Sequence, residues 1–437
     1  MLRFVYTVLF HVAMPLVLLR LWLRGRTEHG YRLHIGERFG LADDPTPNMR
    51  PKQRQIWLHA VSVGEVRAAV PLIDKLRLAF ADHSILLTCM TPTGRRTARS
   101  LLADDIDVVY LPYDLPWALG MFMARHRPKM LIVMETELWP NLLAACQQRQ
   151  VPAFLVNARM SKKSLQGYLK FAPVRMLARQ AIRSFSAIMA QSTDDAMRLS
   201  SLGATAVEVT GNVKFDQALD EAAINRGLAW RKRLDGRKVI LLASTRDHEE
   251  LPLVAAFRQV TDWPLTGQAR RPLLVVVPRH PTRFDAVFTQ LQETGLVVKR
   301  RSQIDDANDG SGDTVQLADV WLGDSMGEMQ SYYAMCDVAM IGGSFEPLGG
   351  QNLIEAAALA KPVVMGPSTF NFSEAVQLAT HANAMRNVAS PADAMTAAKL
   401  LLADSELLAT ISANALGFAT AHGGATDRSI AIIQSHL

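Results

Sequence analysis

Glu65 is the first residue in this sequence whose type and position suggest chemistry. It follows an apolar run, 56–61, and a small flexible turn, 62–64. If the run is a strand and a helix begins at the turn, the carboxylate lies at the carboxyl edge of a parallel sheet and beside a helix N-terminus, which stabilises negative charge. A carboxylate there can take a proton from a substrate hydroxyl. The structural alternative is a glutamate that only complements the helix dipole.

Two more carboxylates follow a second apolar run. Glu135 and Glu137 come directly after 131–134, and their i, i+2 spacing puts both side chains on one face of an extended segment. Trp139 and Pro140 close this segment. Two acids at a sheet edge indicate a further part of a catalytic site, with hydrogen bonding to loop amides as the structural alternative.

A glycine-rich loop lies in 341–355, between a predicted strand and a predicted alanine-rich helix. Gly343 belongs to its first glycine pair, and Asn352 and Glu355 stand where the helix is expected to begin. Glycines let the backbone approach a phosphate, and free N–H groups at a helix start attract anions. Glu355 is placed to accept hydrogen bonds from ribose hydroxyls. Neither GxGxxG nor GxxxxGK[ST] occurs, which argues against a dinucleotide fold and a P-loop.

Polar and basic residues end other predicted strands. Lys214 closes the first half of the chain, Ser244 lies at the end of the first strand of the second half, and Arg279 and His280 follow the next strand. Cations near a phosphate-binding loop would stabilise a nucleotide leaving group. An Asp-x-Asp sequence at 105–107 precedes a strand rather than ending one, so we predict that it lies on the surface and that there is no metal site.

These residues need a scaffold of buried parallel strands. Short runs rich in Val, Ile and Leu alternate with segments of helical spacing, which is typical of strands covered on both faces and joined by right-handed crossovers. A charged connector at 214–237 divides the pattern, and a polar segment at 305–313 is interpreted as a surface loop. We therefore predict an α/β protein with two Rossmann-like parallel-sheet domains facing a cleft. The predicted strands are 56–61, 85–90, 108–111, 130–134, 153–156, 187–190, 207–209, 239–243, 273–277, 338–341 and 362–365.

The N-terminus predicts a membrane anchor. Residues 4–19 carry no charge, and the apolar character continues past Arg20 to Leu23. A helix of about 20 residues is just long enough to cross a hydrocarbon core. Arginines stand where a signal peptide would have its small-residue cleavage site, and by the positive-inside rule they keep the following chain in the cytoplasm. A helix lying in the interface is the alternative to a spanning one.

Composition and charge narrow the class of protein. The 437 residues are 49% hydrophobic and include three widely spaced cysteines, which indicates domains with their own cores and free thiols in a reducing compartment. The net charge is +6, and the stretch between Glu137 and Asp194 contains basic residues but no acidic one. A solvated basic face is the structural alternative to an anionic lipid partner. A nucleic-acid binder is the least favoured alternative, because the basic stretch has no nucleic-acid recognition motif.

Together, the motifs resemble those of the Kdo transferases, the 3-deoxy-D-manno-octulosonic acid transferases. The resemblance covers essentially the whole chain, including the N-terminal anchor. The motifs are HAVSVGE (59–65), TPTGR (91–95), ETELWPN (135–141), NARMSKKS (157–164), GNVKFD (211–216), ASTR (243–246), VPRHP (277–281), GGSF (342–345), GGQNLIEAA (349–357) and MGPSTFNF (365–372).

The resemblance implies a GT-B fold, CMP-Kdo as donor, a lipid A precursor (lipid IVA) as acceptor, and inversion at the anomeric carbon without a metal or other cofactor. On the matching positions Glu65 is the general base and Glu135 a second important carboxylate. In one departure, the family usually has glycine where this chain has His248. The implied donor contacts are Lys214, Ser244, Arg279, His280, Gly343, Asn352 and Glu355, and the predicted acceptor contacts are Arg95, Arg159, Lys162 and Lys163.

We expect a membrane anchor at 1–25, an acceptor-binding domain at 26–214 and a nucleotide-sugar-binding domain at 215–437, on the cytoplasmic face of the inner membrane. The alternatives are a UDP-sugar lipid glycosyltransferase, a GT-B-fold sugar epimerase, and a tethered nucleotide-sugar-binding protein without catalysis. An epimerase would need neither the anchor nor the acid-free basic stretch. How many Kdo residues are added, the oligomeric state and the preferred acyl pattern do not follow from the sequence.

Overall fold

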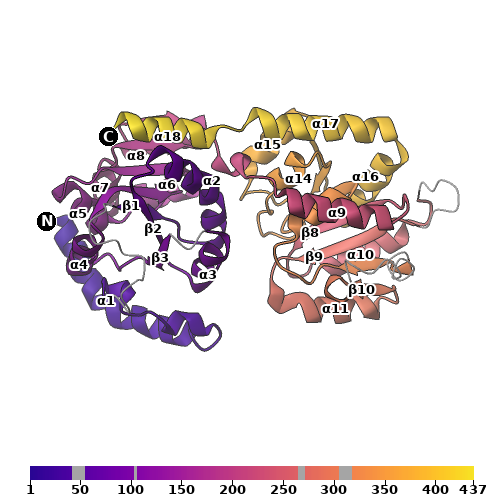
Figure 1. Ribbon diagram of the computed structural model, residues 1–437, viewed down its shortest axis with the longest axis horizontal. Coiled ribbons are helices and arrows are strands. Elements are labelled where there is room, and N and C mark those ends of the chain that lie inside the picture. The colour runs from indigo at the N-terminus through magenta and orange to yellow at the C-terminus, as the bar shows by residue number, and fades with distance from the viewer. Residues whose placement is uncertain (42–54, 103–105, 264–270, 305–316) are drawn as a thin grey trace. The chain divides into compact units, whose positions relative to one another are not determined.

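The computed structural model describes residues 1–41, 55–102, 106–263, 271–304 and 317–437. Contacts divide the chain into a first unit, residues 1–217 with 423–437, and a second unit, residues 218–422 (Figure 1). The expected division at 214/215 differs from this by three residues, and the expected second domain wrongly includes the end of the chain. The segment predicted as a surface loop at 305–313 lies outside the described residues.

The C-terminal helix returns to the first unit for a physical reason. Helix α18 (Ala425–Ser435) buries Ile430 and Ile433 in the core of that unit. The carboxylate of Asp216 accepts hydrogen bonds of 2.6 Å from the backbone N–H groups of Gly424 and Thr426 at the start of the helix. A carboxylate at a helix N-terminus satisfies donors that have no partner within the helix. The last motif of the first unit, GNVKFD, thus also holds the end of the chain.

The first unit is built on a seven-stranded parallel sheet in the order β3-β2-β1-β4-β5-β6-β7. Parallel pairing brings the carboxyl ends of all its strands to one edge. The short third and seventh strands form the two ends of the sheet. The strands are β1 (Gln55–His59), β2 (Ser84–Cys89), β3 (Asp107–Tyr110), β4 (Pro128–Met134), β5 (Ala153–Ala158), β6 (Ala187–Ala190) and β7 (Val207–Val209).

Helices cover both faces of this sheet. In β1, Ile56 and Leu58 belong to one hydrophobic cluster and Trp57 to the other, as alternation along a strand requires. Burial on both faces explains why the strands read as continuous apolar runs. The helices of the unit are α1 (Leu2–Arg24), α2 (Val63–Ala79), α3 (Pro92–Leu101), α4 (Pro116–His126), α5 (Pro140–Gln148), α6 (Lys162–Lys170), α7 (Ala172–Ile182), α8 (Thr193–Leu202) and α18.

The second unit repeats this architecture with a seven-stranded parallel sheet in the order β10-β11-β9-β8-β12-β13-β14. Its strands are β8 (Val239–Thr245), β9 (Leu273–Pro278), β10 (Val298–Arg300), β11 (Val320–Leu322), β12 (Val338–Ile341), β13 (Val363–Met365) and β14 (Met385–Asn387). Its helices are α9 (Glu221–Arg233), α10 (Glu250–Gln259), α11 (Phe284–Glu293), α13 (Met329–Met335), α14 (Ile354–Ala358), α15 (Ser373–His381), α16 (Pro391–Ala403) and α17 (Ser405–Ala421).

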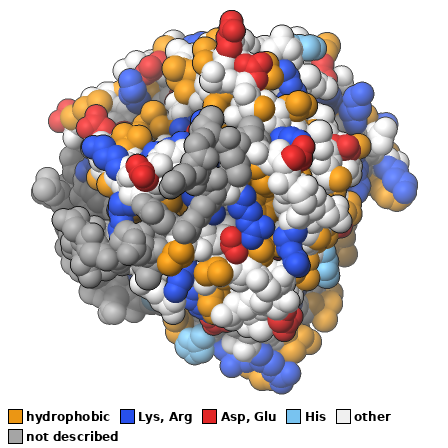
Figure 2. Space-filling model, turned by 90° about the vertical axis from the view of Figure 1, so that its right-hand side faces the viewer, with side chains coloured by type: hydrophobic (Ala, Val, Ile, Leu, Met, Phe, Trp, Pro, Cys, Tyr) orange, Lys and Arg blue, Asp and Glu red, His pale blue; other side chains and the backbone are white. Residues whose placement is uncertain are grey.

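The predicted fold class is confirmed: two parallel-sheet α/β units, and one N-terminal helix, α1, that is long and apolar enough to cross a membrane. Strands β10, β11 and β14 were not predicted. The three residues of β10 and of β14 include charged or polar side chains, whereas the short apolar run of β11 was missed. Figure 2 shows one face of the molecule, on which basic and acidic side chains are scattered among neutral and hydrophobic ones.

Candidate active site

Glu65 occupies the turn that its sequence predicts. Strand β1 ends at His59, and helix α2 begins at Val63 with Ser62 as its N-cap. The Ser62 hydroxyl accepts a hydrogen bond from the backbone N–H of Glu65 and donates one of 2.9 Å to Oε1 of the same residue. Oε2 accepts a hydrogen bond of 2.8 Å from the backbone N–H of Val61. This reciprocal capping fixes the carboxylate at the carboxyl edge of the sheet.

The surroundings of Glu65 raise its pKa toward neutral pH. Burial raises its pKa from 4.5 to about 7, and repulsion by Glu135 and then Glu137 adds to this effect. The hydrogen bonds from Val61 and Ser62 act in the opposite direction. A carboxyl group with a pKa near the working pH both ionises and accepts a proton efficiently, which is what general base catalysis requires.

Glu135 follows the last residue of β4 in a strained conformation. Its φ is 58°, in the left-handed region that costs a residue other than glycine about 1–2 kcal/mol. Its backbone N–H donates to the carbonyl of Val156, and its Oε1 lies 3.2 Å from Nζ of Lys214. Strain of this kind gathers at functional sites, where the surrounding structure holds it in place.

Glu137 completes a group of three carboxylates at this edge. Burial raises its pKa from 4.5 to about 7, and repulsion by Glu135 contributes next. The charge of Glu135 thus disfavours the ionised form of both Glu65 and Glu137. The structure therefore brings together Glu65, Glu135 and Lys214 from three separate motifs.

Asn157 links the strand edge to Lys214. It ends its strand segment with a φ of 57°, and its Oδ1 accepts a hydrogen bond of 3.2 Å from the backbone N–H of Val213. The Asn212 side chain in turn accepts from the backbone N–H of Lys214. These contacts fix the backbone from which the Lys214 side chain reaches Glu135.

The four predicted acceptor contacts differ in their surroundings. Lys162 and Lys163 are exposed in the first turn of α6, where they face solvent. Arg159 is half-buried, and its backbone carbonyl accepts a hydrogen bond from the hydroxyl of Thr136. Arg95 is different: it is 6% exposed, and both its terminal nitrogens donate to the carboxylate of Glu37. The geometry thus argues against Arg95 as an acceptor contact, because its guanidinium is held in a buried ion pair.

In the second unit, a buried glutamate holds the glycine loop in shape. Glu249 accepts hydrogen bonds from the backbone N–H groups of Gly343, at 2.6 Å, and Phe345, at 3.0 Å. It also accepts one from the N–H of Arg246, so the same carboxylate joins the loop after β8 to the loop after β12. At Gly342 a Cβ atom would lie 2.5 Å from the carbonyl oxygen of Ser244, which excludes any larger residue.

Asn352 and Glu355 lie at the start of α14. Asn352 accepts a hydrogen bond from the N–H of Ile354 and donates one of 3.1 Å to Oε1 of Glu355. The expected alanine-rich helix is only five residues long, and Glu355 lies in its first turn, where the sequence predicts the helix to begin. Burial raises the pKa of Tyr333; the charge of Glu355 adds to this effect and the charge of Arg279 opposes it, so both charges lie near the Tyr333 side chain.

His280 lies in a basic surrounding. Burial lowers its pKa, and the nearby Arg246, Arg279 and Arg283 lower it further against the opposing effect of Asp247. The adjacent loop carries the residue that departs from the family pattern. His248 has a φ of 72°, the left-handed conformation that glycine adopts without cost.

Three residues that support the site were not predicted from the sequence. Glu249 and Glu250 are buried acids, and Glu250 accepts from Arg283 and from the Thr245 hydroxyl. Glu37 pairs with Arg95 and accepts from the N–H of Tyr110. Two adjacent acids directly after a strand-end Ser-Thr-Arg were the available signal for the first pair. Nothing local to Glu37 distinguishes it from a surface acid.

The remaining predictions concern metals, cysteines and the Asp-x-Asp sequence. Among the described residues, no group of three or more His, Cys, Asp and Glu side chains could hold a metal ion. Cys89, Cys146 and Cys336 are buried and free, as predicted. Asp107 corrects an expectation: it is buried in β3 and accepts a hydrogen bond from Gln55 rather than lying on the surface.

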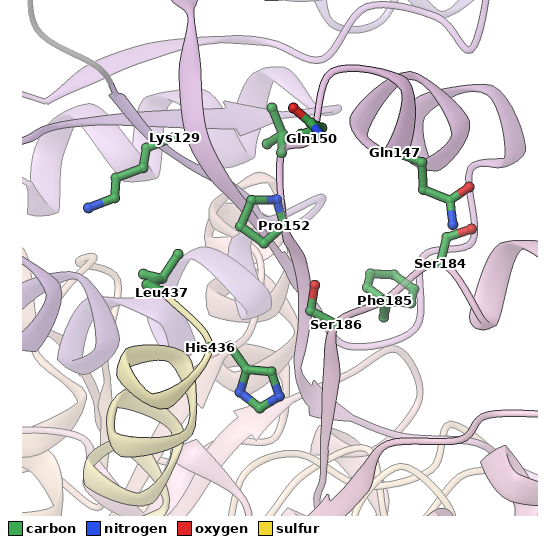
Figure 3. Close-up of a pocket in the computed structure, with 10 residues that line it drawn as sticks. Lys129, Gln147, Gln150, Pro152, Ser184, Phe185, Ser186, His436 and Leu437 are labelled. Atoms are coloured by element: carbon green, nitrogen blue, oxygen red, sulfur yellow. The ribbon is translucent and has the colours of Figure 1, made fainter.

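A cavity at the opposite edge of the first sheet is a poor candidate. It has a volume of about 580 Å³ and lies at the amino ends of β4, β5 and β6, between Lys129, Ser186 and His436 (Figure 3). Ligands of open parallel sheets bind outside the carboxyl ends of the strands, where Glu65 and Glu135 lie. The carboxyl edge is therefore the candidate site.

Solved structures with the same architecture define the class of the fold. The chain resembles Anabaena HepE in complex with UDP-glucose, with a TM-score of 0.55, 16% identity, and coverage of 88% of this chain and 100% of the other. The Staphylococcus aureus MnaA–UDP structure gives a TM-score of 0.55 at 17% identity, covering 88% of this chain and 97% of that one. At these identities the likeness concerns the fold alone. The class is the GT-B fold of two parallel-sheet units.

Sequence relatives identify the family. The family model described as "3-Deoxy-D-manno-octulosonic-acid transferase (kdotransferase)" matches residues 33–217. The 3-deoxy-D-manno-octulosonic acid transferase of Bordetella pertussis is 41% identical over 443 aligned residues, covering 100% of this chain and 99% of the relative. That of Haemophilus influenzae is 33% identical, covering 92% and 91%. The chain therefore belongs to the Kdo transferase family, a family of glycosyltransferases.

Proposed function

We propose that this protein transfers Kdo from CMP-Kdo to a lipid A precursor, lipid IVA, at the cytoplasmic face of the inner membrane, in lipopolysaccharide biosynthesis. The observation that carries the proposal is Glu65, fixed at a helix start with a pKa of about 7 beside two further carboxylates. Membership of the family supports the transferred sugar.

In the proposed reaction, the Glu65 carboxylate removes the proton of an acceptor hydroxyl while the hydroxyl oxygen bonds to the anomeric carbon of Kdo. The bond between that carbon and the phosphate oxygen of CMP breaks, and its electron pair leaves with CMP. Attack and departure occur on opposite sides of the carbon, so the configuration inverts. A positioned general base contributes about 10²–10⁴-fold to such a step.

Glu135 and Lys214 act on the base rather than on the bond that breaks. The charge of Glu135 keeps the pKa of Glu65 high, and Lys214 limits that effect through its ion pair of 3.2 Å. The proposal assigns Lys214 to the acceptor half of the reaction, although the family resemblance implied a donor contact. Its contact with Glu135, within the first unit, supports this assignment.

The second unit is proposed to bind CMP-Kdo. Backbone N–H groups of the glycine loop and the guanidinium of Arg279 would stabilise the phosphate. Ser244, His280 and Gly343 would shape the binding surface, and Asn352 and Glu355 would orient the ribose hydroxyls. The hydrogen bonds of Glu249 to Gly343 and Phe345, which hold the loop in shape, support this role.

The acceptor is proposed to meet the exposed basic side chains of the first unit. Lys162 and Lys163 begin α6, with no acidic residue in its first turn to neutralise them. Phosphate groups of a lipid A precursor suit such lysines, and the same charge suits an anionic leaflet. Arg159 is proposed as a third contact, while Arg95 is left out because of its buried ion pair with Glu37.

The test is an assay of the full-length protein with CMP-Kdo and a tetra-acylated lipid A precursor in phospholipid vesicles, with products counted by mass. We expect Kdo addition that persists with a metal chelator, and loss of about 100-fold or more for Glu65→Gln. CMP binding by the variant should be unchanged. Full activity of Glu65→Gln would contradict the assignment of Glu65 as the general base. Product from a UDP-sugar, and none from CMP-Kdo, would favour the alternative donor.

A further inference from the structure

One face of α1 packs against the first unit along most of the helix. Phe10, Met14, Val17 and Leu21 pack against a small cluster of Tyr113, Leu115 and Ala118 at the start of α4. The spacing of the four residues, three and four apart, is that of one helical face. The intervening positions face away from the unit. Figure 1 shows α1 running along the outside of the first unit rather than projecting from it.

The N-terminal turns of the helix are held by polar contacts. Thr7 accepts a hydrogen bond of 2.9 Å from the side chain of Asn141, and the Tyr6 hydroxyl is hydrogen-bonded to the carboxylate of Asp114. Asp114 is 1% exposed and also accepts from the backbone N–H groups of Asn141 and Leu142 at the start of α5. The beginning of α1 therefore belongs to a buried polar network of the globular unit.

The other end of α1 forms a cluster of arginine and tryptophan. The guanidinium groups of Arg26 and Arg32 lie 4.4 and 5.0 Å from the ring of Trp22, and Arg32 also donates to the carbonyl of Trp22 at 3.0 Å. Tryptophan and arginine together are typical of the level of lipid headgroups. Arg20 and Arg24 add positive charge in the last turns of the helix.

The outer face of α1 is apolar and exposed. Leu9, Val12 and Leu16 are 62%, 72% and 69% exposed, and the helix has no acidic residue. Such a surface, next to an arginine cluster, fits a lipid leaflet with anionic headgroups. The other large apolar side chains exposed on this helix are Phe4, Val5, Val8, Leu18, Leu19, Trp22 and Leu23.

These contacts decide between a spanning and a flat helix. From Thr7 to Leu21 the helix rises about 21 Å, most of the thickness of a hydrocarbon core. Both ends of that length rest on the same globular unit. If α1 crossed the membrane, Tyr6 and Thr7 would lie near the far side. Their partners, Asp114 and Asn141, would then have to enter the hydrocarbon, or both hydrogen bonds would break. Buried polar groups without partners in lipid cost several kcal/mol each.

We propose that α1 does not cross the bilayer but lies along the cytoplasmic leaflet, with its outer face in the lipid and its inner face bound to the first unit. The inference rests on the membrane partner of the proposed function and not on its donor, acceptor or base. Asn141 ends the ETELWPN motif that begins with Glu135, so the contact with Thr7 fixes the height of the carboxylate group above the leaflet.

Depth measurement on the full chain tests the orientation. Single cysteines at Leu9, Leu16 and Leu23, in a background with the three buried native thiols replaced by alanine, are spin-labelled in phosphatidylethanolamine–phosphatidylglycerol vesicles. A flat helix places all three labels at similar depth. A spanning helix gives a steady trend, because Leu9 and Leu23 are about 21 Å apart along the axis. Such a trend would overturn the proposal.

A matched pair of charged variants provides an independent test. Leu16→Asp lies on the outer face and Val17→Asp on the inner face, one residue further. We expect Leu16→Asp to weaken binding to the same vesicles at least tenfold with an unchanged melting temperature. Val17→Asp should lower the melting temperature of detergent-solubilised protein. Equal loss of membrane binding with no change in melting temperature for both would contradict a docked helix. Neither readout uses Kdo transfer, so a wrong acceptor or base would leave these results unaffected.

Discussion

Nζ of Lys214 lies 3.2 Å from Oε1 of Glu135, so a residue of the GNVKFD motif neutralises a carboxylate that comes 79 positions earlier in the chain. Because Glu135 repels the charged form of Glu65, we expect the ion pair to reduce the negative charge that acts on Glu65. We therefore expect removal of Lys214 and removal of Glu135 to shift the pH dependence of activity in opposite directions.

Removing the cation should shift the pH dependence of activity to higher pH. In Lys214→Met, the charge of Glu135 is no longer balanced, so the pKa of Glu65 rises further and less carboxylate is available at neutral pH. Stability should change little, by about 1 kcal/mol or less, because the pair is partly exposed to water. The pH profile of kcat/KM checks this, with Lys214→Arg as the control that keeps the charge. An unchanged profile would show that Lys214 does not act on Glu65.

Removing the Glu135 carboxylate should shift the pH profile of kcat/KM to lower pH. The pKa of Glu65 is about 7, so kcat/KM of the unmodified protein should rise as the pH increases through about 7. In Glu135→Gln the first repulsive charge is gone, and the rise should move to lower pH with a reduced rate. Glu137→Gln should give a smaller shift, because Glu137 contributes less to the pKa of Glu65. A larger shift for Glu137→Gln would contradict this order.

The same pKa value predicts the effect of Glu65 on stability. A carboxyl group whose pKa is raised by folding, from 4.5 to about 7, stabilises the folded state while it is protonated. Stability should therefore fall as the pH rises from about 4.5 to 7. Denaturation as a function of pH should show a weaker fall for Glu65→Gln, whose side chain does not ionise.

Two neighbouring arginines allow a matched test of buried and exposed ion pairs. Arg95 pairs with Glu37, and both side chains are at least 90% buried. Arg96 pairs with Glu28 at 2.9 Å, but Arg96 is 64% exposed. Glu37→Ala leaves a buried charge unpaired and should reduce the free energy of unfolding by about 3–5 kcal/mol. Glu28→Ala should change it by about 1 kcal/mol or less. Equal effects in urea denaturation would refute the structural role of Glu37.

Replacing His248 with glycine, the residue that the family usually has at this position, should stabilise the folded protein. Its φ of 72° strains any residue with a Cβ, so His248→Gly should raise stability by about 1 kcal/mol, or about 2–4 °C in melting temperature. His280→Gly is the control: its φ is −119°, so glycine there only adds freedom to the unfolded chain and should not stabilise. A lower melting temperature for His248→Gly would mean that the histidine side chain makes a stabilising contact.

Glu249 should be required for the shape of the donor site. Glu249→Gln places an amide N–H₂ group among the backbone N–H groups of Gly343, Phe345 and Arg246, which need acceptors. A buried donor left without a partner costs about 1–3 kcal/mol, so both melting temperature and CMP affinity should fall. Asp247→Asn, at an exposed position, is the control. Calorimetric titration with CMP would contradict the prediction if the affinity of Glu249→Gln were unchanged.

The sequence determined the class of the fold, because strands buried on both faces must be continuous apolar runs. It also placed Glu65 and Glu135 directly after such runs, and the parallel sheet puts them at one edge. The short strands β10 and β14 were beyond its reach, since their three residues include charged or polar side chains and form no apolar run.

Tertiary structure alone decided which charges meet. Arg95 reads as a surface cation, yet Glu37, 58 positions earlier, holds it in a buried pair. Lys214 reads as a phosphate ligand, yet it forms an ion pair with Glu135. An apolar N-terminal segment has the same composition whether it spans or lies flat, and the proposal of a flat helix rests on tertiary contacts such as that of Thr7 with Asn141. Long-range pairing depends on how elements pack, which no local pattern encodes.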